Sequence, residues 1–207
     1  DLHRVDRRQR QMCIRDRVSS VLLEADAQPR VSLKGFTTLR AGGPAEWFTQ
    51  ARTVDRLAEL AARAQRAGVR TTILGWGSNV LPSDDGVPGL TIHNMATRIE
   101  IRENGEVEAD AGCGFQELFL KTAQAALSGL EFAVGIPGTL GGALVSNAGA
   151  YRSNVSEHVT EIEIVEGGDR RWVEPAWMRF SYRDSRLRRS DGPACALLRV
   201  RLSLIHI

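Results

Sequence analysis

Two separated stretches of the chain are rich in glycine and small hydroxyl residues, a composition that suits a phosphate site. The first is GWGSN at residues 75–79, and the second is GIPGTLGGALVSNAGAY at residues 135–151. Such glycines serve either tight turns that need positive φ or a ligand that must touch peptide N–H groups with no Cβ in between. Consecutive N–H groups in such loops can form a concavity that binds anions. From these residues alone, structural turns and a phosphate site are equal alternatives.

The sequence lacks the motifs of other nucleotide-binding loops and of metal sites. Neither stretch is followed by the Gly-Lys-Ser/Thr of a Walker loop, and the GxGxxG dinucleotide fingerprint is absent from the first strand-to-helix turn. Outside the chain ends, the only cysteines are Cys113 and Cys195, and His93 and His158 have no Cys or carboxylate partner at ligand spacing. We therefore expect no metal site. Two distant cysteines suit a reducing compartment such as the cytoplasm.

Both ends of the sequence read as translated sequencing adapter. Residues 7–17, RRQRQMCIRDR, back-translate to a transposon-type adapter with its mosaic end, and residues 1–6 fit the primer and index before it. Residues 202–207, LSLIHI, fit the reverse complement of the same mosaic end. We predict that residues 1–17 and 202–207 are artefact, removable without loss of folding, and that residues 18–201 are an internal fragment.

Charge and hydropathy then exclude two classes of partner. Without the six arginines and three aspartates of residues 1–17, the formal net charge of +2 becomes about −1. No basic patch with interleaved aromatic residues remains, so we expect no nucleic-acid partner. No apolar run approaches the length of a membrane span, so we expect no membrane partner either.

Residue periodicity predicts the elements that must position the glycine stretches. Residues 53–68 fit an amphipathic helix with Thr53 as N-cap and Gly68 as its stop, and a strand at 69–74 leads into GWGSN. Strands are also predicted at 89–95 and 196–202, hairpins at 99–112 and 158–174, and a helix at 115–129 before the second glycine stretch. Open α/β sheets present ligand loops at the carboxyl ends of their strands, as GWGSN would be. The order is α/β first and mixed α+β afterwards, with a seam at residues 95–99.

Five blocks of the chain closely resemble, in order and spacing, the FAD-binding part of the UDP-N-acetylenolpyruvoylglucosamine reductase (MurB) family. They are TTLRAGGPAEWF (37–48), LGWGSNVLPSDDGVPGL (74–90), ADAGCGFQEL (109–118), GLEFAVGIPGTLGGALVSNAGAY (129–151) and FSYRDSRLR (180–188). The resemblance implies an α+β fold of the vanillyl-alcohol-oxidase (PCMH) type, in which two α+β subdomains clasp FAD. These would be residues 18–96 and 97–201, with the family's C-terminal substrate domain missing beyond residue 201.

The resemblance also assigns the glycine stretches to a non-covalently bound FAD. The residues that would approach its pyrophosphate are Gly75, Gly77, Ser78 and Asn79 on one side, and Gly135, Ile136, Pro137, Gly138, Thr139 and Gly142 on the other. Asn147, Ala148 and Gly149 would continue the flavin site. For Trp76, packing and contact with the cofactor are equal alternatives.

The implied reaction belongs to peptidoglycan precursor synthesis in the cytoplasm. NADPH would reduce FAD, and the reduced flavin would pass hydride to the enolpyruvyl double bond of UDP-N-acetylglucosamine-enolpyruvate, which gives UDP-N-acetylmuramate. Arg183 stands where the family places the arginine that polarises the substrate carboxylate, and Tyr182 matches a substrate-contacting position. The family's proton-donating serine or cysteine and its C-terminal glutamate are not present, so the fragment alone should be inactive. No obligate protein partner is inferred.

The chain departs from the family's motifs at two positions. The family's Asn-Thr is Thr37-Thr38 here, and the glycine that usually follows NAGAY is Arg152, so either turn could be altered.

One alternative function is that of another flavin oxidoreductase of the same fold that acts on a sugar or alcohol. Many of these tether FAD through histidine or cysteine, and Cys113 alone stands beside the glycines. The other alternative is a non-catalytic FAD-binding module.

Overall fold

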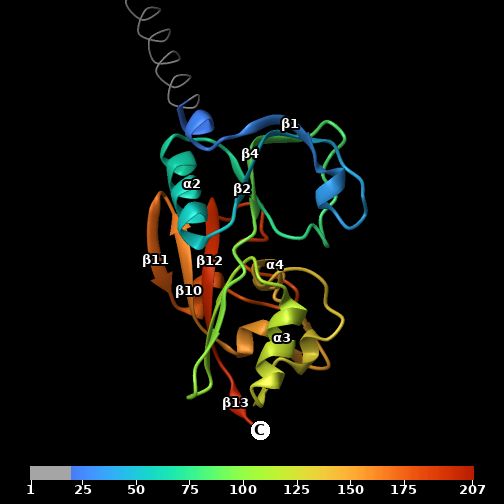
Figure 1. The fold of residues 1–207 in the computed structure, drawn as a ribbon, viewed down its shortest axis with the longest axis vertical. Helices are drawn as coiled ribbons and strands as arrows, with labels where there is room; N and C mark the ends of the chain where they lie inside the picture. The colour runs from blue at the N-terminus through green and yellow to red at the C-terminus, as the bar shows by residue number, and fades with distance from the viewer. Residues whose placement is uncertain (1–19) are drawn as a thin grey trace, which may run out of the picture.

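The computed structural model describes residues 20–207, which form two sheets with helix α2 (Val54–Arg66) packed between them (Figure 1). Helices α3 (Phe115–Gln124) and α4 (Leu140–Val145) cover the opposite face of the second sheet. The adapter origin predicted for residues 1–17 falls outside the described residues. Mixed α and β content in two sheet-based halves agrees with the predicted α+β class.

Sheet A carries the first glycine stretch at one of its strand ends. Its order is β1-β2-β4-β3, with β1 antiparallel to β2 and the other three strands parallel. The strands are β1 (Gln28–Ser32), β2 (Pro44–Ala51), β3 (Thr71–Leu74) and β4 (Val87–Asn94). Because β3 ends at Leu74, GWGSN lies at the carboxyl end of a parallel strand, as predicted.

Helix α2 connects β2 to β3 and joins the two sheets. It begins where the Thr53 hydroxyl accepts a hydrogen bond from Arg56 N at 3.2 Å, and it ends before Gly68, which has φ of +70°. Its apolar stripe, with Leu57 and Leu60 almost fully buried, packs on β4 and also on Leu198 of the second sheet. Burying each such leucine contributes about 1.5 to 3 kcal/mol, so α2 holds the two halves together.

Sheet B is antiparallel throughout and has the order β11-β10-β12-β6-β5. Its strands are β5 (Ile99–Ile101), β6 (Glu106–Asp110), β10 (Val159–Glu166), β11 (Asp169–Val173) and β12 (Cys195–Ser203). The hairpin turns at Gly105 (φ of +83°) and at Gly167–Gly168 (φ of +63° and +90°) lie where the sequence placed them. Sheet A uses residues 28–94 and sheet B residues 99–203, on either side of the predicted seam.

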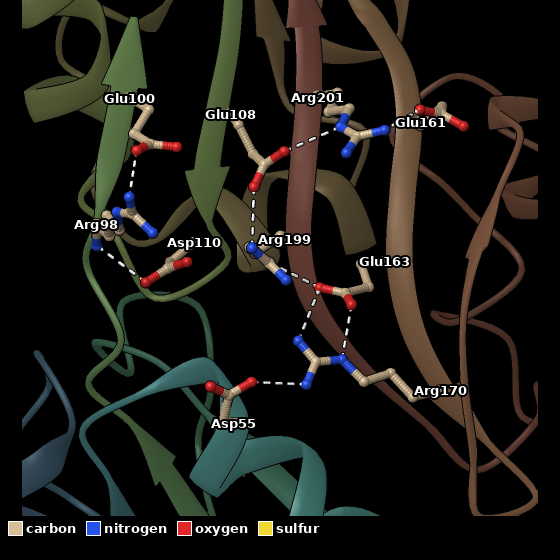
Figure 2. Close-up of polar contacts among 10 residues, drawn as sticks. All are labelled: Asp55, Arg98, Glu100, Glu108, Asp110, Glu161, Glu163, Arg170, Arg199 and Arg201. Carbon is tan, nitrogen blue, oxygen red and sulfur yellow. Dashed lines mark hydrogen bonds and ion pairs between the residues drawn. The ribbon is translucent and has the colours of Figure 1, made fainter.

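The face of sheet B on which α2 packs carries, beside the helix, alternating carboxylates and guanidinium groups (Figure 2). The chain of ion pairs runs Asp55–Arg170–Glu163–Arg199–Glu108–Arg201–Glu161, with N–O distances of 2.6 to 2.9 Å. Burial raises the pKa of Glu163, but hydrogen bonds from Arg170 and Arg199 outweigh it and hold that pKa below its usual range. The stabilisation from a lowered carboxyl pKa is present above its unfolded pKa and is lost as pH falls through the folded pKa. Acid should therefore remove the contribution of Glu163 to the stability of this face.

Short elements complete the described chain and include the parts that the sequence did not predict. The two-residue strands are β7 (Leu127–Ser128), β8 (Gly149–Ala150), β9 (Ser153–Asn154) and β13 (Ile205–His206). The 3₁₀ turns are η1 (Leu33–Phe36), η2 (Glu131–Ala133), η3 (Val155–Glu157) and η4 (Pro175–Met178). The helix predicted over 115–129 is shorter because Ala126 has φ of +56° and residues 127–128 pair with β13. Strands β1 and β2 and helix α4 were not predicted, and reading all of 135–151 as loop was wrong at 140–145.

The unusual residue after NAGAY occupies a strained turn. Tyr151 and Arg152 join β8 to β9, with φ of +53° and +69°. Positive φ at both central residues is the pattern of a type I′ hairpin turn, which favours Asn-Gly because other side chains clash with the backbone there. Glycine would fit without that cost, so Arg152 retains the turn at an energetic penalty.

Residues 202–204 complete the core of sheet B's covered face. Leu202 is fully buried, Leu204 is 5% exposed, and Leu202 pairs with Val107 across β6. The adapter origin of residues 202–207 stays a prediction, but the expectation that they can be removed at no cost disagrees with this packing. The physical reason is that alternate side chains of β12 point into the core, so an apolar residue at position 202 packs there whatever its origin.

We predict that Leu202→Ala lowers the free energy of unfolding by about 2 to 5 kcal/mol, the usual cost of a buried leucine cavity. Chemical denaturation of the parent and variant chains measures this loss. Ser203→Ala is the matched control, because Ser203 is exposed at the next position and should change stability by less than about 0.5 kcal/mol. Equal stability of parent and Leu202→Ala would show that residues 202–204 do not pack as described.

Candidate functional site

A cavity of about 760 Å³ lies where the two glycine stretches meet. That volume falls in the range of small-molecule and cofactor sites. Eleven of the fifteen residues predicted for the site line it, and they are Gly75, Gly77, Ser78, Asn79, Ile136, Pro137, Gly138, Thr139, Gly142, Ala148 and Arg183. Its remaining walls come from β3, α4 and the start of β12.

The first glycine stretch is shaped by the chain that precedes sheet A. Gly77 has φ of +63°, and a Cβ there would lie 2.1 Å from the Phe36 carbonyl oxygen. The Gly77 carbonyl accepts a hydrogen bond from Thr38 N at 3.2 Å, and the neighbouring Thr37 hydroxyl closes its own turn on Ala41 O at 2.9 Å. Thr37, which stands where the family has asparagine, therefore stabilises the turn of residues 37–41. Gly77 is required by the protein itself, so its replacement would not test cofactor binding alone.

The two stretches touch each other through contacts between the backbone of one and side chains of the other. The Ser78 hydroxyl donates to Pro137 O at 3.2 Å, and a Cβ at Gly138 would lie 2.6 Å from that same hydroxyl. A Cβ on Gly75 would lie 2.6 Å from Thr139 Oγ1. Glycine at positions 75 and 138 therefore serves close approach of the two loops, which closes one side of the cavity.

Unused backbone donors line the region where the loops meet. Within the described part of the chain, the N–H groups of residues 77–79 and 138–139 donate no hydrogen bond. Unpaired N–H groups are costly when buried, and a set of them is what a bound phosphate oxygen requires. No acidic residue is among the described residues that line the cavity, whereas Arg183 and Arg188 both are. The site thus offers N–H donors and positive charge, which suits a dianionic ligand.

Arg183 reaches the cavity from a turn that is tied to the second glycine stretch. Ser181 and Asp184 exchange backbone hydrogen bonds of 3.0 and 3.2 Å around Tyr182 and Arg183. The Asn147 amide donates to Ser181 O at 2.9 Å, which holds the turn against the segment that follows α4. The predicted catalytic arginine and the predicted cofactor loops therefore meet in one site.

Four predicted site residues do not line the cavity. Tyr182 is 92% exposed, and Gly135 has open space where a Cβ would be. Asn147 is buried behind the wall, and Gly149 faces the β9 backbone, where a Cβ would lie 2.4 Å from Ser153 O. Asn147 and Gly149 both contact neighbouring backbone, and their contact with the cofactor stays a prediction.

Several cavity residues were missed by sequence reasoning, and one was left open. Cys195, Leu197 and Pro193 line the cavity at the start of β12, outside both glycine stretches, so no local signal identified them. The Trp76 ring both packs on Gly114, where a Cβ would lie 2.5 Å from it, and lines the cavity. Both of the roles considered for Trp76 are therefore compatible with its position.

The two cysteines are poorly suited to form a covalent bond with a cofactor. Burial raises the pKa of both the Cys113 and the Cys195 thiol to about 12. The reactive thiolate is therefore scarce at neutral pH. Cys113 is fully buried and does not line the cavity. Among the described residues no group of three His, Cys, Asp or Glu side chains is placed to hold a metal ion, and no helix there is long and apolar enough to cross a membrane.

We predict that Gly142→Ala weakens FAD binding by on the order of tenfold without destabilising the protein. Gly142 lies in the first turn of α4, and an added methyl would contact only Thr139 Oγ1, at an ordinary 3.5 Å, beside the cavity. Alanine is a better helix former than glycine, so the free energy of unfolding should stay equal or rise by up to about 1 kcal/mol. Flavin titration and chemical denaturation separate the two effects.

Gly35→Ala is the matched control for Gly142→Ala. Its methyl would have nothing within 4 Å, and Gly35 lies outside the cavity. FAD affinity should therefore equal that of the parent chain. An unchanged affinity in Gly142→Ala would mean that FAD does not approach α4.

We also predict that denaturation in guanidinium chloride releases all of the bound flavin, because neither thiol forms a bond to it. Ultrafiltration of the denatured protein measures the fraction of yellow colour that passes the filter. Flavin retained with the polypeptide would indicate a tether, and Cys195→Ser would then show whether the cavity cysteine provides it.

Comparisons with known proteins agree with this site. The chain is 40% identical over 183 residues to the UDP-N-acetylenolpyruvoylglucosamine reductase of Synechococcus sp. (strain JA-3-3Ab), an alignment that covers 87% of this chain and 58% of the relative. It is 38% identical over 164 residues to the reductase of the same name from Halalkalibacterium halodurans, covering 78% of this chain and 54% of the relative. The chain therefore spans a little over half the length of these relatives.

Solved structures show the same arrangement of elements. The UDP-N-acetylenolpyruvylglucosamine reductase (MurB) of Thermus caldophilus superposes with a TM-score of 0.72 at 31% identity, over 87% of this chain and 62% of that one. The glucooligosaccharide oxidase of Acremonium strictum superposes with a TM-score of 0.56 at 14% identity, over 91% of this chain and 42% of that one. The second likeness shows the fold alone, and its FAD is described as 6-S-cysteinyl and 8α-N1-histidyl.

A family described as the FAD binding domain matches residues 45–174. That range is more than half of the chain and contains both glycine stretches, α4 and most of the cavity wall. The geometry and the match agree on the ligand, and the chain belongs to the FAD-binding domain family.

Proposed function

We propose that the chain is the FAD-binding part of a UDP-N-acetylenolpyruvoylglucosamine reductase, a cytoplasmic flavoenzyme of peptidoglycan precursor synthesis. In the full enzyme NADPH reduces FAD, which supplies hydride chemistry, and the substrate is UDP-N-acetylglucosamine-enolpyruvate. The observation that carries the proposal is Arg183, which lines the same cavity as both glycine stretches.

The roles of the chain's own residues follow from their positions. The N–H groups of residues 77–79 and 138–139 would hold the pyrophosphate of FAD, which fits donors that have no other partner. Arg183 would face the substrate carboxylate, where its planar, permanently charged guanidinium can stabilise the charge that develops as hydride arrives. Tyr182, the residue before it, is exposed and would contact the substrate.

The two halves of the fold would have separate tasks in this proposal. Residues 18–96 and 97–201 would each supply one glycine stretch, so that FAD lies between them. The proton donor, the acidic residue near the C-terminus and most substrate contacts would come from the part of the relatives that this chain does not span. We therefore expect the chain alone to bind FAD and not to turn over.

We predict that Arg183→Lys, in a full-length enzyme that contains this segment, slows flavin reoxidation by the enolpyruvyl substrate by about 10²- to 10³-fold, or roughly 2.7 to 4 kcal/mol. An ammonium is charged but cannot reproduce the bidentate contact of a guanidinium with a carboxylate. Flavin reduction by NADPH and FAD affinity should change little. Stopped-flow absorbance measures the two half-reactions separately.

The neighbouring Arg189→Lys is the control, because Arg189 pairs with Asp184 and does not line the cavity. Both of its half-reactions should keep the parent rates. If Arg183→Lys instead slows only the NADPH half-reaction, the arginine serves the reductant and the assignment is wrong.

A further inference from the structure

Arg183 reaches the cavity in a backbone conformation that its own residue type disfavours. It has φ of +54° in the turn that Ser181 and Asp184 close. A residue with a Cβ is disfavoured in the left-handed region of backbone conformation, which glycine enters freely. Such a conformation persists only where surrounding contacts hold it, so the question is which residues hold this one.

Two buried side chains tie the turn to the segment that follows α4. The Asn147 amide donates to Ser181 O at 2.9 Å, and the Ser185 hydroxyl donates to Val145 O at 2.7 Å. Asn147 is 7% exposed and Ser185 is fully buried, so both donor side chains lie in the protein. The turn is therefore joined to the end of α4 and to the residues after it by two side-chain hydrogen bonds.

A third bond comes from within the cavity wall and acts on Arg183 itself. Arg188 Nη1 donates to the Arg183 carbonyl at 2.8 Å, and Arg188 lines the cavity. No carboxylate among the described residues forms an ion pair with Arg188. The adjacent Arg189 differs in both respects, since its Nε pairs with Asp184 Oδ2 at 2.9 Å and it lies outside the cavity.

We propose that Asn147 and Arg188 are positioning residues for Arg183: together they fix the turn that keeps the Arg183 side chain in the cavity. This inference rests on the proposed function, which gives Arg183 its role. It also assigns Asn147 a role distinct from direct cofactor contact, because its side chain faces the turn and not the cavity.

Two other roles for Arg188 make different predictions. If Arg188 binds an anionic group of FAD directly, its loss weakens binding whether or not Arg183 is present. If it only stabilises the protein, its loss lowers the free energy of unfolding and leaves the bound flavin unaffected. A residue that acts through Arg183 must lose its effect on the flavin when Arg183 is gone.

The test uses the chain as it stands, with FAD affinity from fluorescence titration and the visible absorption spectrum of the bound flavin as readouts. A charge close to the flavin alters the flavin's electronic properties, so displacement of the Arg183 guanidinium should shift the absorption spectrum. A variant that only destabilises the protein should leave this spectrum unchanged. Arg183→Ala sets the reference, with a spectral shift and an affinity reduced several-fold. We expect Arg188→Gln to give a shift in the same direction and a two- to tenfold weaker affinity, and Arg188→Lys, which keeps a donor for the carbonyl, to recover most of both.

The double variants decide between direct and indirect action. In the Arg183→Ala background, Arg188→Gln should cause no further change in affinity or spectrum. Arg102→Gln removes the same charge from an exposed residue that pairs with Glu106 outside the cavity, and it should match the parent chain. An Arg188→Gln effect of equal size with and without Arg183 would overturn the proposal in favour of direct binding, and no effect at all would overturn it outright.

Asn147→Gly supplies an independent second variant. Glycine accepts the φ of +42° at this position, so the backbone can stay in place while the amide bond to Ser181 is lost. We expect the same spectral shift, again absent in the Arg183→Ala background. Failure of the parent chain to bind FAD would count against the proposed function, whereas normal FAD binding with an unshifted spectrum in both Arg188→Gln and Asn147→Gly would count against the positioning role alone.

Discussion

The close approach of the two glycine stretches is the constraint on which the site depends. GWGSN and the residues before α4 meet at Gly75, Gly138 and the bond from Ser78 to Pro137, where a Cβ would come within 2.6 Å of a side chain. This contact joins the end of a strand in sheet A to the entry of a helix that covers sheet B. It can form only because α2 packs on both sheets and fixes their separation. The cavity is thus a product of the whole packing, and the glycines are what permit it.

The elements that periodicity controls could be predicted from the sequence. Helix α2, with its Thr53 cap and Gly68 stop, and the two hairpins at Gly105 and Gly167–Gly168 lie where expected, because local residue types determine them. The edge strand β1 is short and mostly exposed, so no alternation marked it. Helix α4 was not predicted because its glycines lower helix propensity. It forms because Thr139 caps it and its core face packs against Ala111.

The composition of the site was more predictable than the roles within it. Glycine and serine at two loops pointed to a phosphate site, and both loops line the cavity. The signal could not separate residues that contact a ligand from those that support the loops, because both need the same backbone freedom. Gly149 and Asn147, for example, contact the backbone at Ser153 and Ser181, and such contacts look the same from sequence as contact with a ligand. Cys195 and Leu197 line the cavity because β12 pairs with β10. That pairing joins distant parts of the chain, and no sequence motif indicates it.

In the proposed site, backbone N–H groups of residues 77–79 and 138–139 hold the pyrophosphate of FAD. Amide hydrogen exchange of the chain, measured with FAD and with riboflavin at saturating concentrations, tests this contact, since riboflavin carries the same ring and no phosphate. FAD should slow exchange at these amides and riboflavin should not, while amides in the remote β10–β11 hairpin stay unchanged with both. Equal protection of the two loops by FAD and riboflavin, or none by either, would contradict it.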